Sequence, residues 1–312
     1  MQLWQKTMIY LATHGKVKNF METYLSGSVL ARRFCGGSDP DAAVKTARNL
    51  KTVGRTASLF YLGEYVTDTT VTGKTLNSLE RAAALAGQAG LDCHISVDPT
   101  QIGLMQGFSP CRANLSRLAR RIRSGPETRD VLMIDMEDNS VTDATLNLFH
   151  QLATEGLPVA VTLQACLYRT PEDLDKIMER PAMVRLVKGA FAEGSAIAWT
   201  RKADIDRAYR SLARQMLSND AISKGFYPVF ATHDHRMTAR ISEMARDKGI
   251  PKQAFEFEML YGVRPGLEES LIKDGFQVRL YLPFGRDFWS YSIRRIGENP
   301  GNIKFLLRSL TN

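Results

Sequence analysis

The sequence is poor in cysteine: its 312 residues include only four, Cys35, Cys93, Cys111 and Cys166. They lie far apart, and none forms a CxxC motif or the cysteine–histidine spacing of a zinc site. The five histidines also lack the HExxH spacing. The pattern therefore disfavours a disulfide framework and a metal centre, and it predicts reduced thiols in a reducing compartment.

Long apolar runs are lacking as well. No segment reaches the roughly 18 apolar residues that would span a membrane, and residues 1–25 lack the hydrophobic stretch of a secretory signal. We therefore expect a cytoplasmic protein, for which peripheral association with the inner membrane stays open. The formal net charge of +8 is spread along the chain without clusters of basic and aromatic residues. This distribution argues against nucleic acid as a partner.

What the chain does have is an alternation of short β-rich runs with longer helical patterns, which is typical of parallel β/α units. Eight runs fit, at residues 57–62, 93–97, 131–136, 158–164, 184–190, 227–231, 254–259 and 277–282. Eight is the number that closes a (β/α)8 barrel, a TIM-like α/β fold. A doubly wound sheet is the alternative, but no GxGxxG follows the first run, which weakens it.

Residues 1–50 are predicted to form a mainly helical N-terminal extension, and residues 51–312 to form the barrel as one domain. Asp39 followed by Pro40 should cap the helix before the first strand. Thr170 followed by a proline should cap a later helix, and Asp143 should open another.

Polar residues close almost every predicted strand, and in such a barrel they meet at one mouth. They are Glu64, Asp98, Gln101, Asp135, Glu137, Gln164, Arg185, Lys188, Thr232, His233, Asp234, Glu258 and Tyr281. A rim this polar predicts a binding or catalytic site rather than a purely structural barrel.

Two cations stand inside an otherwise apolar predicted strand, at Arg185 and Lys188. A buried cation is costly unless it is compensated. The pair therefore indicates either an anionic or electron-rich ligand, or an internal ion pair with Asp135 or Glu137. Both interpretations remain open at this point.

A second pair of cations, Arg294 and Arg295, follows the last predicted strand. Taken alone, such a pair is most often an ordinary solvated basic dipeptide. Beside a barrel mouth, however, planar guanidinium groups are suited to grip a carboxylate. A small carboxylate substrate is the first hypothesis.

Several motifs occur in consistent order from about residue 31 to the C-terminus. They are YLGE at 61–64, TQIGL at 100–104, IDMEDNSVTDATL at 134–146, LQACLYRTPEDL at 163–174, VRLVKGAF at 184–191, FATHD at 230–234, FEFEMLYGVR at 255–264 and RLYLPFG at 279–285. Together with the arginine pair they resemble the flavin-dependent proline dehydrogenases. The resemblance implies a distorted (β/α)8 barrel that holds FAD at its C-terminal face. It also implies oxidation of proline to Δ1-pyrroline-5-carboxylate and transfer of the electrons to a quinone.

The resemblance further implies roles for single residues. On the cofactor side these are Arg185 near the flavin N5 edge, Lys188, Gly189, Ala190 and Gln164 as further flavin contacts, Thr232 and His233 along the pyrophosphate and adenosine, and Glu298 at the cofactor's hydroxyls. On the substrate side they are Arg294 and Arg295 as the carboxylate pair, Leu260 and Tyr281 around the ring, Asp135 behind them, and Glu64 as a partner of one arginine.

Two positions depart from the family pattern. Asp98 stands where the family has a Lys that completes the carboxylate clamp, and Phe191 stands where many members have Tyr. Replacing a cation by an anion changes the local charge by two units, which should oppose binding of a carboxylate. We therefore expect an FAD-dependent oxidoreductase that moves hydride from the carbon beside an amine nitrogen of a small amino or imino acid to flavin N5, with a substrate other than proline.

Two alternatives accompany this expectation. The first is an authentic proline dehydrogenase, in which Asp98 pairs with Arg294 or Arg295. The second belongs to another class, an FAD-binding regulatory protein whose catalytic site has decayed.

Overall fold

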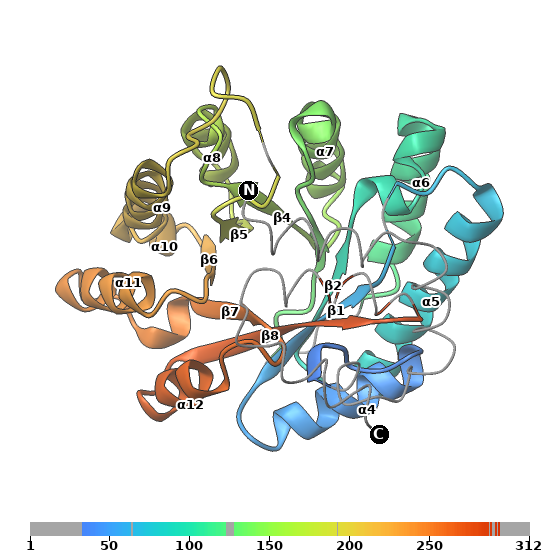
Figure 1. Ribbon diagram of the computed structural model, residues 1–312, viewed down its shortest axis with the longest axis horizontal. Coiled ribbons are helices and arrows are strands. Elements are labelled where there is room, and N and C mark those ends of the chain that lie inside the picture. Colours follow the sequence, from blue (N-terminus) through green and yellow to red (C-terminus); the bar gives the residue numbers. More distant parts are fainter. Residues whose placement is uncertain are drawn as a thin grey trace.

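Eight parallel strands close a barrel in the order β1-β2-β3-β4-β5-β6-β7-β8, with helices around it (Figure 1). The computed structural model describes residues 33–63, 65–122, 128–191 and 193–286, together with positions 288, 291 and 293. The strands are β1 (Thr56–Tyr61), β2 (Cys93–Val97), β3 (Leu132–Ile134), β4 (Val159–Gln164), β5 (Met183–Val187), β6 (Tyr227–Ala231), β7 (Glu256–Leu260) and β8 (Gln277–Phe284). The predicted TIM-like fold class is confirmed.

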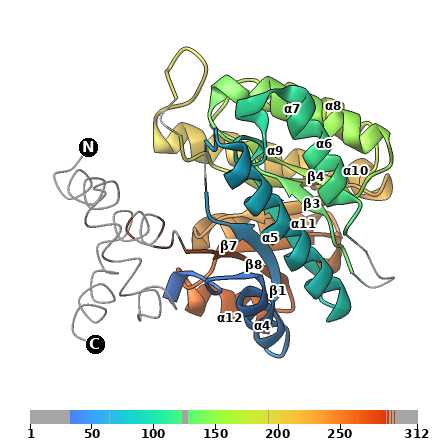
Figure 2. The ribbon, with the colours of Figure 1, turned by 90° about the vertical axis from the view of Figure 1, so that its right-hand side faces the viewer.

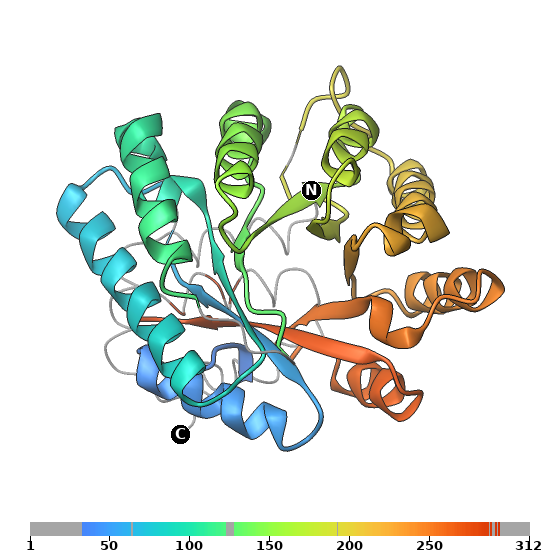
Figure 3. The ribbon, with the colours of Figure 1, turned by 180° about the vertical axis from the view of Figure 1, so that it is seen from behind.

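Helices form a ring around the strands, which Figures 2 and 3 show from the side and from behind. They are α4 (Pro40–Lys51), α5 (Thr69–Gln88), α6 (Phe108–Ala119), α7 (Asn139–Thr154), α8 (Thr170–Met178), α9 (Lys202–Met216), α10 (Asn219–Ser223), α11 (His235–Asp247) and α12 (Pro265–Lys273), with short 3-10 turns η1 (Pro99–Gln101), η2 (Leu104–Gln106) and η3 (Lys252–Ala254). Helix α4 packs against β1, β8 and α5 and lies in the ring between α12 and α5. The division of the chain at residue 50 stays a prediction.

Aspartate side chains cap several of these helices. Asp39 accepts a hydrogen bond from the backbone of α4, as predicted. Asp138 caps α7 by accepting from the Ser140 backbone N at 2.8 Å, so the predicted start at Asp143 is wrong: the helix begins more than one turn earlier. Thr170 is already helical and donates its hydroxyl to a backbone carbonyl, so it is not the cap of α8.

The barrel wall separates an outer core from an inner one, because successive strand residues point to opposite faces. Outward side chains pack under the helices in the main core, among them Leu59, Ile95, Val161, Phe257 and Leu280. Inside the barrel, Met133, Ala160, Met183 and Val229 form a small apolar cluster. The barrel interior also holds a cluster of charged and hydroxyl side chains, which leads to the candidate site.

Among the described residues, no helix is both long and apolar enough to cross a membrane. The same part of the chain contains no group of three or more His, Cys, Asp or Glu residues arranged to hold a metal ion. All four cysteines lie within it as buried free thiols.

Candidate active site

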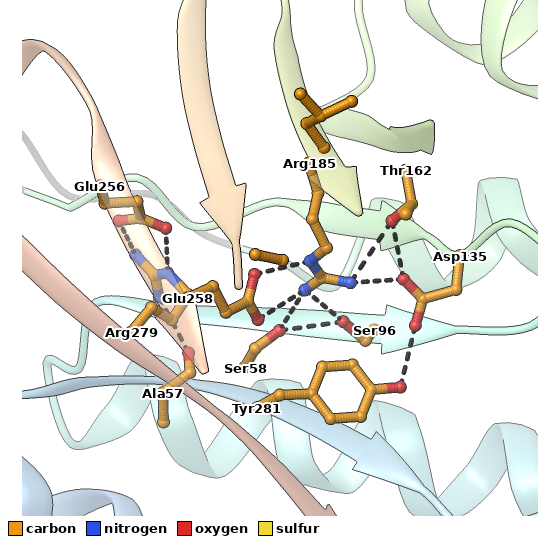
Figure 4. Close-up of polar contacts among 12 residues, drawn as sticks. Ala57, Ser58, Ser96, Asp135, Thr162, Arg185, Glu256, Glu258, Arg279 and Tyr281 are labelled. Carbon is orange, nitrogen blue, oxygen red and sulfur yellow. Dashed lines mark hydrogen bonds and ion pairs between the residues drawn. The ribbon is translucent and has the colours of Figure 1, made fainter. Parts of the chain in front are cut away.

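The polar interior of the barrel is centred on Arg185 of β5, whose side chain is only 3% exposed. Its Nε and Nη2 donate to the two carboxylate oxygens of Glu258 at 2.6 and 2.8 Å, and its Nη1 donates to Asp135 (Figure 4). Nη2 also donates to the hydroxyls of Ser58 and Ser96 at 2.8 and 2.9 Å. Partners on every side fix the orientation of this guanidinium group.

Asp135 connects this arginine to the mouth of the barrel. Its Oδ1 accepts from the Thr162 hydroxyl at 2.9 Å, and its Oδ2 accepts from the Tyr281 hydroxyl at 2.9 Å. The Arg185 guanidinium carbon lies 5.2 Å from the centre of the Tyr281 ring. Burial, and then the negative charges of Asp135 and Asp98, raise the pKa of Tyr281 well above its ordinary value. The phenol therefore stays protonated and serves as a donor.

A second arginine, Arg279 of β8, lies deeper in the same interior and is fully buried. Its Nε and Nη2 donate to Glu256 at 2.6 and 3.1 Å, and Nη2 donates to Asp92 at 2.6 Å. Its Nη1 donates to the Ala57 carbonyl at 2.8 Å. The barrel interior thus holds two stacked arginine–carboxylate clusters (Figure 4).

Asp98 follows β2 and is half-buried. It occupies the position before turn η1, but its side chain makes no capping hydrogen bond there. Its charge contributes to the raised pKa of Tyr281. The carboxylate therefore acts electrostatically on the mouth of the barrel.

The turn after β5 packs tightly on the end of β4. Gly189 has φ +108°, and a Cβ atom at this position would lie 2.3 Å from the Cys166 Sγ and 3.2 Å from the Gln164 Oε1. Gln164 is buried and donates through Nε2 to the Glu137 carbonyl at 2.8 Å. Only glycine fits here, and the backbone that follows is exposed at Ala190.

Lys188, on the same turn, is held by two carboxylates. Its Nζ lies 2.6 Å from Asp206 and 3.1 Å from Asp234. Burial opposes ionisation of both aspartates, but the ammonium group beside them brings the pKa of each below its ordinary value. The predicted internal ion pair with Asp135 forms at Arg185. Lys188 instead pairs with Asp206 and Asp234, neither of which was named as a partner in advance.

Thr232 and His233 follow β6 and link it to its neighbours. The Thr232 hydroxyl accepts from the Asp234 backbone N at 3.2 Å. The His233 Nε2 accepts from the Leu260 backbone N at 2.9 Å, so a neutral imidazole carries its proton on Nδ1. This contact places Leu260, at the end of β7, beside His233.

The residues predicted for the site fall into separate groups. One hydrogen-bonded network contains Arg185, Asp135 and Tyr281, with Asp98 acting on it by charge. The ends of β4 to β7 carry Gln164, Lys188, Gly189, Ala190, Thr232, His233 and Leu260. Outside the described residues lie Glu64, Arg294, Arg295 and Glu298.

Sequence reasoning missed several members of the network. These are Ser58, Ser96 and Thr162, together with the pairing of Glu258 with Arg185. The available signal was the two-residue period of the strands, which puts small polar side chains on the inner face. That period identifies which side chains point into the barrel, but it does not identify which of them form hydrogen bonds with one another.

The groups at the ends of β4, β5 and β6 fit a flavin. A buried amide at Gln164, a cation at Lys188 and an imidazole N–H at His233 are donors of the kind that a flavin's ring acceptors and phosphates require. Gly189 lets this turn pack directly against Cys166 and Gln164, which brings the donors of β4 and β5 together. These observations agree with the cofactor that the resemblance implies.

Comparison with known proteins decides the family. The chain matches the sequence profile described as proline dehydrogenase over residues 43–308. It belongs to the proline dehydrogenase family. Members of this family are oxidoreductases that act on a CH–NH bond and typically use FAD. The chain is therefore an oxidoreductase of this family, which leaves the decayed regulatory protein unsupported.

Full-length relatives and solved structures agree with this assignment. The chain is 33% identical over 304 residues to Proline dehydrogenase 2 of Bacillus subtilis, with 97% of each chain covered. It is 31% identical over 311 residues to Proline dehydrogenase of Deinococcus radiodurans, covering 99% of this chain and 98% of the other. The structure of proline utilization A from Bdellovibrio bacteriovorus superposes with a TM-score of 0.77 at 26% identity. That match covers 86% of this chain and 32% of the other, so this chain corresponds to about a third of that longer protein.

Both of these full-length relatives carry the name proline dehydrogenase, which bears on the substrate proposed below.

Proposed function

We propose that this protein is an FAD-dependent dehydrogenase that oxidises proline at the carbon beside its nitrogen, giving Δ1-pyrroline-5-carboxylate. The observation that carries the proposal is the fixed network of Arg185, Asp135 and Tyr281 at the mouth of a barrel of this family. In such barrels the ends of the strands hold the reacting groups.

The cofactor would be held by the groups at the ends of β4, β5 and β6. We assign these contacts to Gln164, Arg185, Lys188, Gly189, Ala190, Thr232 and His233, with Glu298 as a further ligand beyond the described residues. Bound FAD would supply the oxidant, taking up a hydride from the substrate carbon while the nitrogen loses a proton and a C=N bond forms.

The substrate would lie over Tyr281 and Leu260. Asp135 holds the phenol of Tyr281 in one orientation through the 2.9 Å hydrogen bond, which keeps this wall of the site fixed. We assign the substrate carboxylate to Arg294 and Arg295, because two guanidinium groups suit a bidentate acid. An electron acceptor, for which we propose a quinone, would then reoxidise the cofactor.

The charge of Asp98 favours a second candidate, a dehydrogenase for a related amine with an additional cationic or hydrogen-bond-donating group. An anion that acts on Tyr281 would attract such a group and would weaken the binding of a bare carboxylate. We rank this candidate second because the full-length relatives are named proline dehydrogenases, which supports proline as the substrate.

Anaerobic titration of the FAD-loaded protein tests the proposal. Proline should bleach the visible flavin absorption and yield Δ1-pyrroline-5-carboxylate, while pyrrolidine, which lacks the carboxylate, should act far more weakly. Bleaching by a diamino acid but not by proline would favour the second candidate. A purified protein that retains no FAD would contradict both.

A further inference from the structure

The barrel interior holds two arginine–glutamate pairs of the same design. Glu256 and Glu258 are two residues apart on β7, so both point inward. Each forms a bidentate pair with one buried arginine, Glu256 with Arg279 and Glu258 with Arg185 (Figure 4). Both glutamates are almost fully buried, at 1% and 2% exposure.

The two pairs differ in what lies beyond the arginine. Arg279 also contacts Asp92 and the Ala57 carbonyl, at the end of the barrel opposite the mouth. Arg185 also contacts Asp135, which in turn accepts from the Tyr281 hydroxyl. Only the pair formed by Glu258 is therefore connected to the candidate site.

The cluster around Arg185 carries more negative than positive charge. One guanidinium faces two carboxylates, Glu258 and Asp135, whose side chains are 2% and 12% exposed. Hydroxyls of Ser58 and Ser96 also accept from Nη2, whereas Nε donates to Glu258. Glu258 therefore satisfies the Nε donor and also brings a second carboxylate charge, which a neutral acceptor would not bring. Burying a second carboxylate against a single cation is unfavourable, and burial raises the pKa of Glu258 despite the arginine.

We propose that Glu258 is a positioning residue for the site at the barrel mouth. It holds Arg185 in the orientation that reaches Asp135. Its carboxylate also offsets the positive charge of Arg185, so that Glu258, Arg185 and Asp135 together carry a net negative charge beneath the bound cofactor and substrate. This inference rests on the proposed function, because it assigns the cluster to the environment of a bound flavin.

Glu258→Gln tests the charge, with Glu256→Gln as its matched control. Both variants remove one carboxylate charge from a buried bidentate pair, so both should lower the thermal stability. Only Glu258→Gln should favour reduction of bound FAD, by about tenfold in the equilibrium constant, which is about 30 mV for a two-electron couple. The potential rises because the reduced, anionic flavin then faces less negative charge. The same potential in Glu258→Gln and wild type, or equal shifts in both variants, would overturn the proposal.

Glu258→Asp tests the positioning role. If Glu258→Gln does not fold, this second variant still tests the proposal. It keeps the charge but shortens the side chain by one methylene, so the flavin potential should stay at the wild-type value while kcat falls. A wild-type kcat in this variant, or a potential shifted as far as the tenfold change above, would overturn the proposal. These outcomes are separate from failure of the proposed function, in which the wild-type protein itself would bind no FAD or would not oxidise proline.

Discussion

At the scale of single residues, the candidate site consists of side chains that already have fixed partners. Tyr281 is held by Asp135, Asp135 by Arg185 and Thr162, and Lys188 by two aspartates. Partners of this kind hold a site in one geometry before the substrate arrives, which lowers the cost of binding. Asp98 acts on this network through its charge, and it is the most informative single residue to change.

Asp98→Asn should improve the binding of proline. The change removes a negative charge near Tyr281 and keeps the size of the side chain, so repulsion of the substrate carboxylate falls. We expect KM for proline to decrease by about fivefold, the ratio that about 1 kcal/mol gives. Pyrrolidine is the control substrate, because without a carboxylate it should gain nothing. An unchanged KM for proline would show that this charge does not reach the substrate.

Gly189→Ala should destabilise the turn after β5 and reduce retention of FAD. The positive φ and the 2.3 Å approach to Cys166 make any side chain unfavourable at this position, at a cost of about 1 to 3 kcal/mol. Gly194→Ala, in the same connection, is the matched control, since a Cβ there meets nothing within 4 Å. Flavin content and melting temperature measure the difference, and equal behaviour of the two variants would contradict the assignment.

At the scale of elements, aspartates fix where the helices begin and hence how each strand end is oriented. Asp138 begins α7 directly after the segment that carries Asp135 and Glu137. Its carboxylate also accepts from the Tyr65 hydroxyl of the β1–α5 connection. A single cap therefore connects the first and third β/α units, which lie on either side of β2 in the barrel.

Asp138→Ala should lower the free energy of unfolding by about 1 kcal/mol, the usual value of a lost N-cap. Asp143→Ala is the control on the same helix. Its side chain is 87% exposed in an ion pair with Arg169, and exposed pairs contribute little, about 0.5 kcal/mol. Urea unfolding followed by circular dichroism distinguishes them. A larger loss for the control would mean that the helix starts where the sequence pattern placed it.

At the scale of the whole molecule, the barrel encloses charge as well as apolar side chains. Arg185 and Arg279 with their carboxylates occupy one part of the interior, and Met133 and Met183 belong to the apolar cluster in another. Buried ion pairs of this kind are weak contributors to stability, since desolvation cancels much of their attraction. For the cluster around Arg185, which reaches Tyr281 through Asp135, this weak contribution to stability agrees with a role at the mouth.

His94 makes the stability of the whole fold depend on pH. Burial first, and then the positive charges of Arg279 and Arg185, hold its pKa well below the ordinary 6.5. Below pH 6.5 the unfolded chain binds this proton and the folded chain does not, so stability falls as the pH falls, by up to about 1.4 kcal/mol per pH unit. The melting temperature should therefore decrease between pH 6.5 and pH 5.

His94→Leu should flatten this pH dependence, because the replaced side chain cannot titrate. His150, whose pKa is lowered by burial and by Arg180, leaves a smaller residual slope. The same pH profile in the variant and in wild type would show that His94 takes up its proton in the folded state.

The sequence by itself determined the fold class, the family and the set of residues at the strand ends. Alternation of β-rich and helical patterns depends on local periodicity, which a single chain displays directly. The local pattern also predicted correctly that Asp39 caps α4. The predicted cap at Thr170 was wrong, because a threonine hydroxyl can donate to a buried carbonyl instead of capping a helix. Local signals identify an element and the face on which a side chain lies.

Only the tertiary structure decided which of those side chains meet. Arg185 pairs with Glu258, 73 residues further along the chain, and donates to Ser58, 127 residues before it. Closure of the barrel and the register between β4, β5 and β6 bring such residues together, and neither is written in the local pattern. The sequence could therefore name two possible carboxylate partners for Arg185, of which Asp135 is one, but it could not identify Glu258. The reason is physical: a period of two fixes the inward face, while the choice among several inward carboxylates depends on how all eight strands pack around a shared interior.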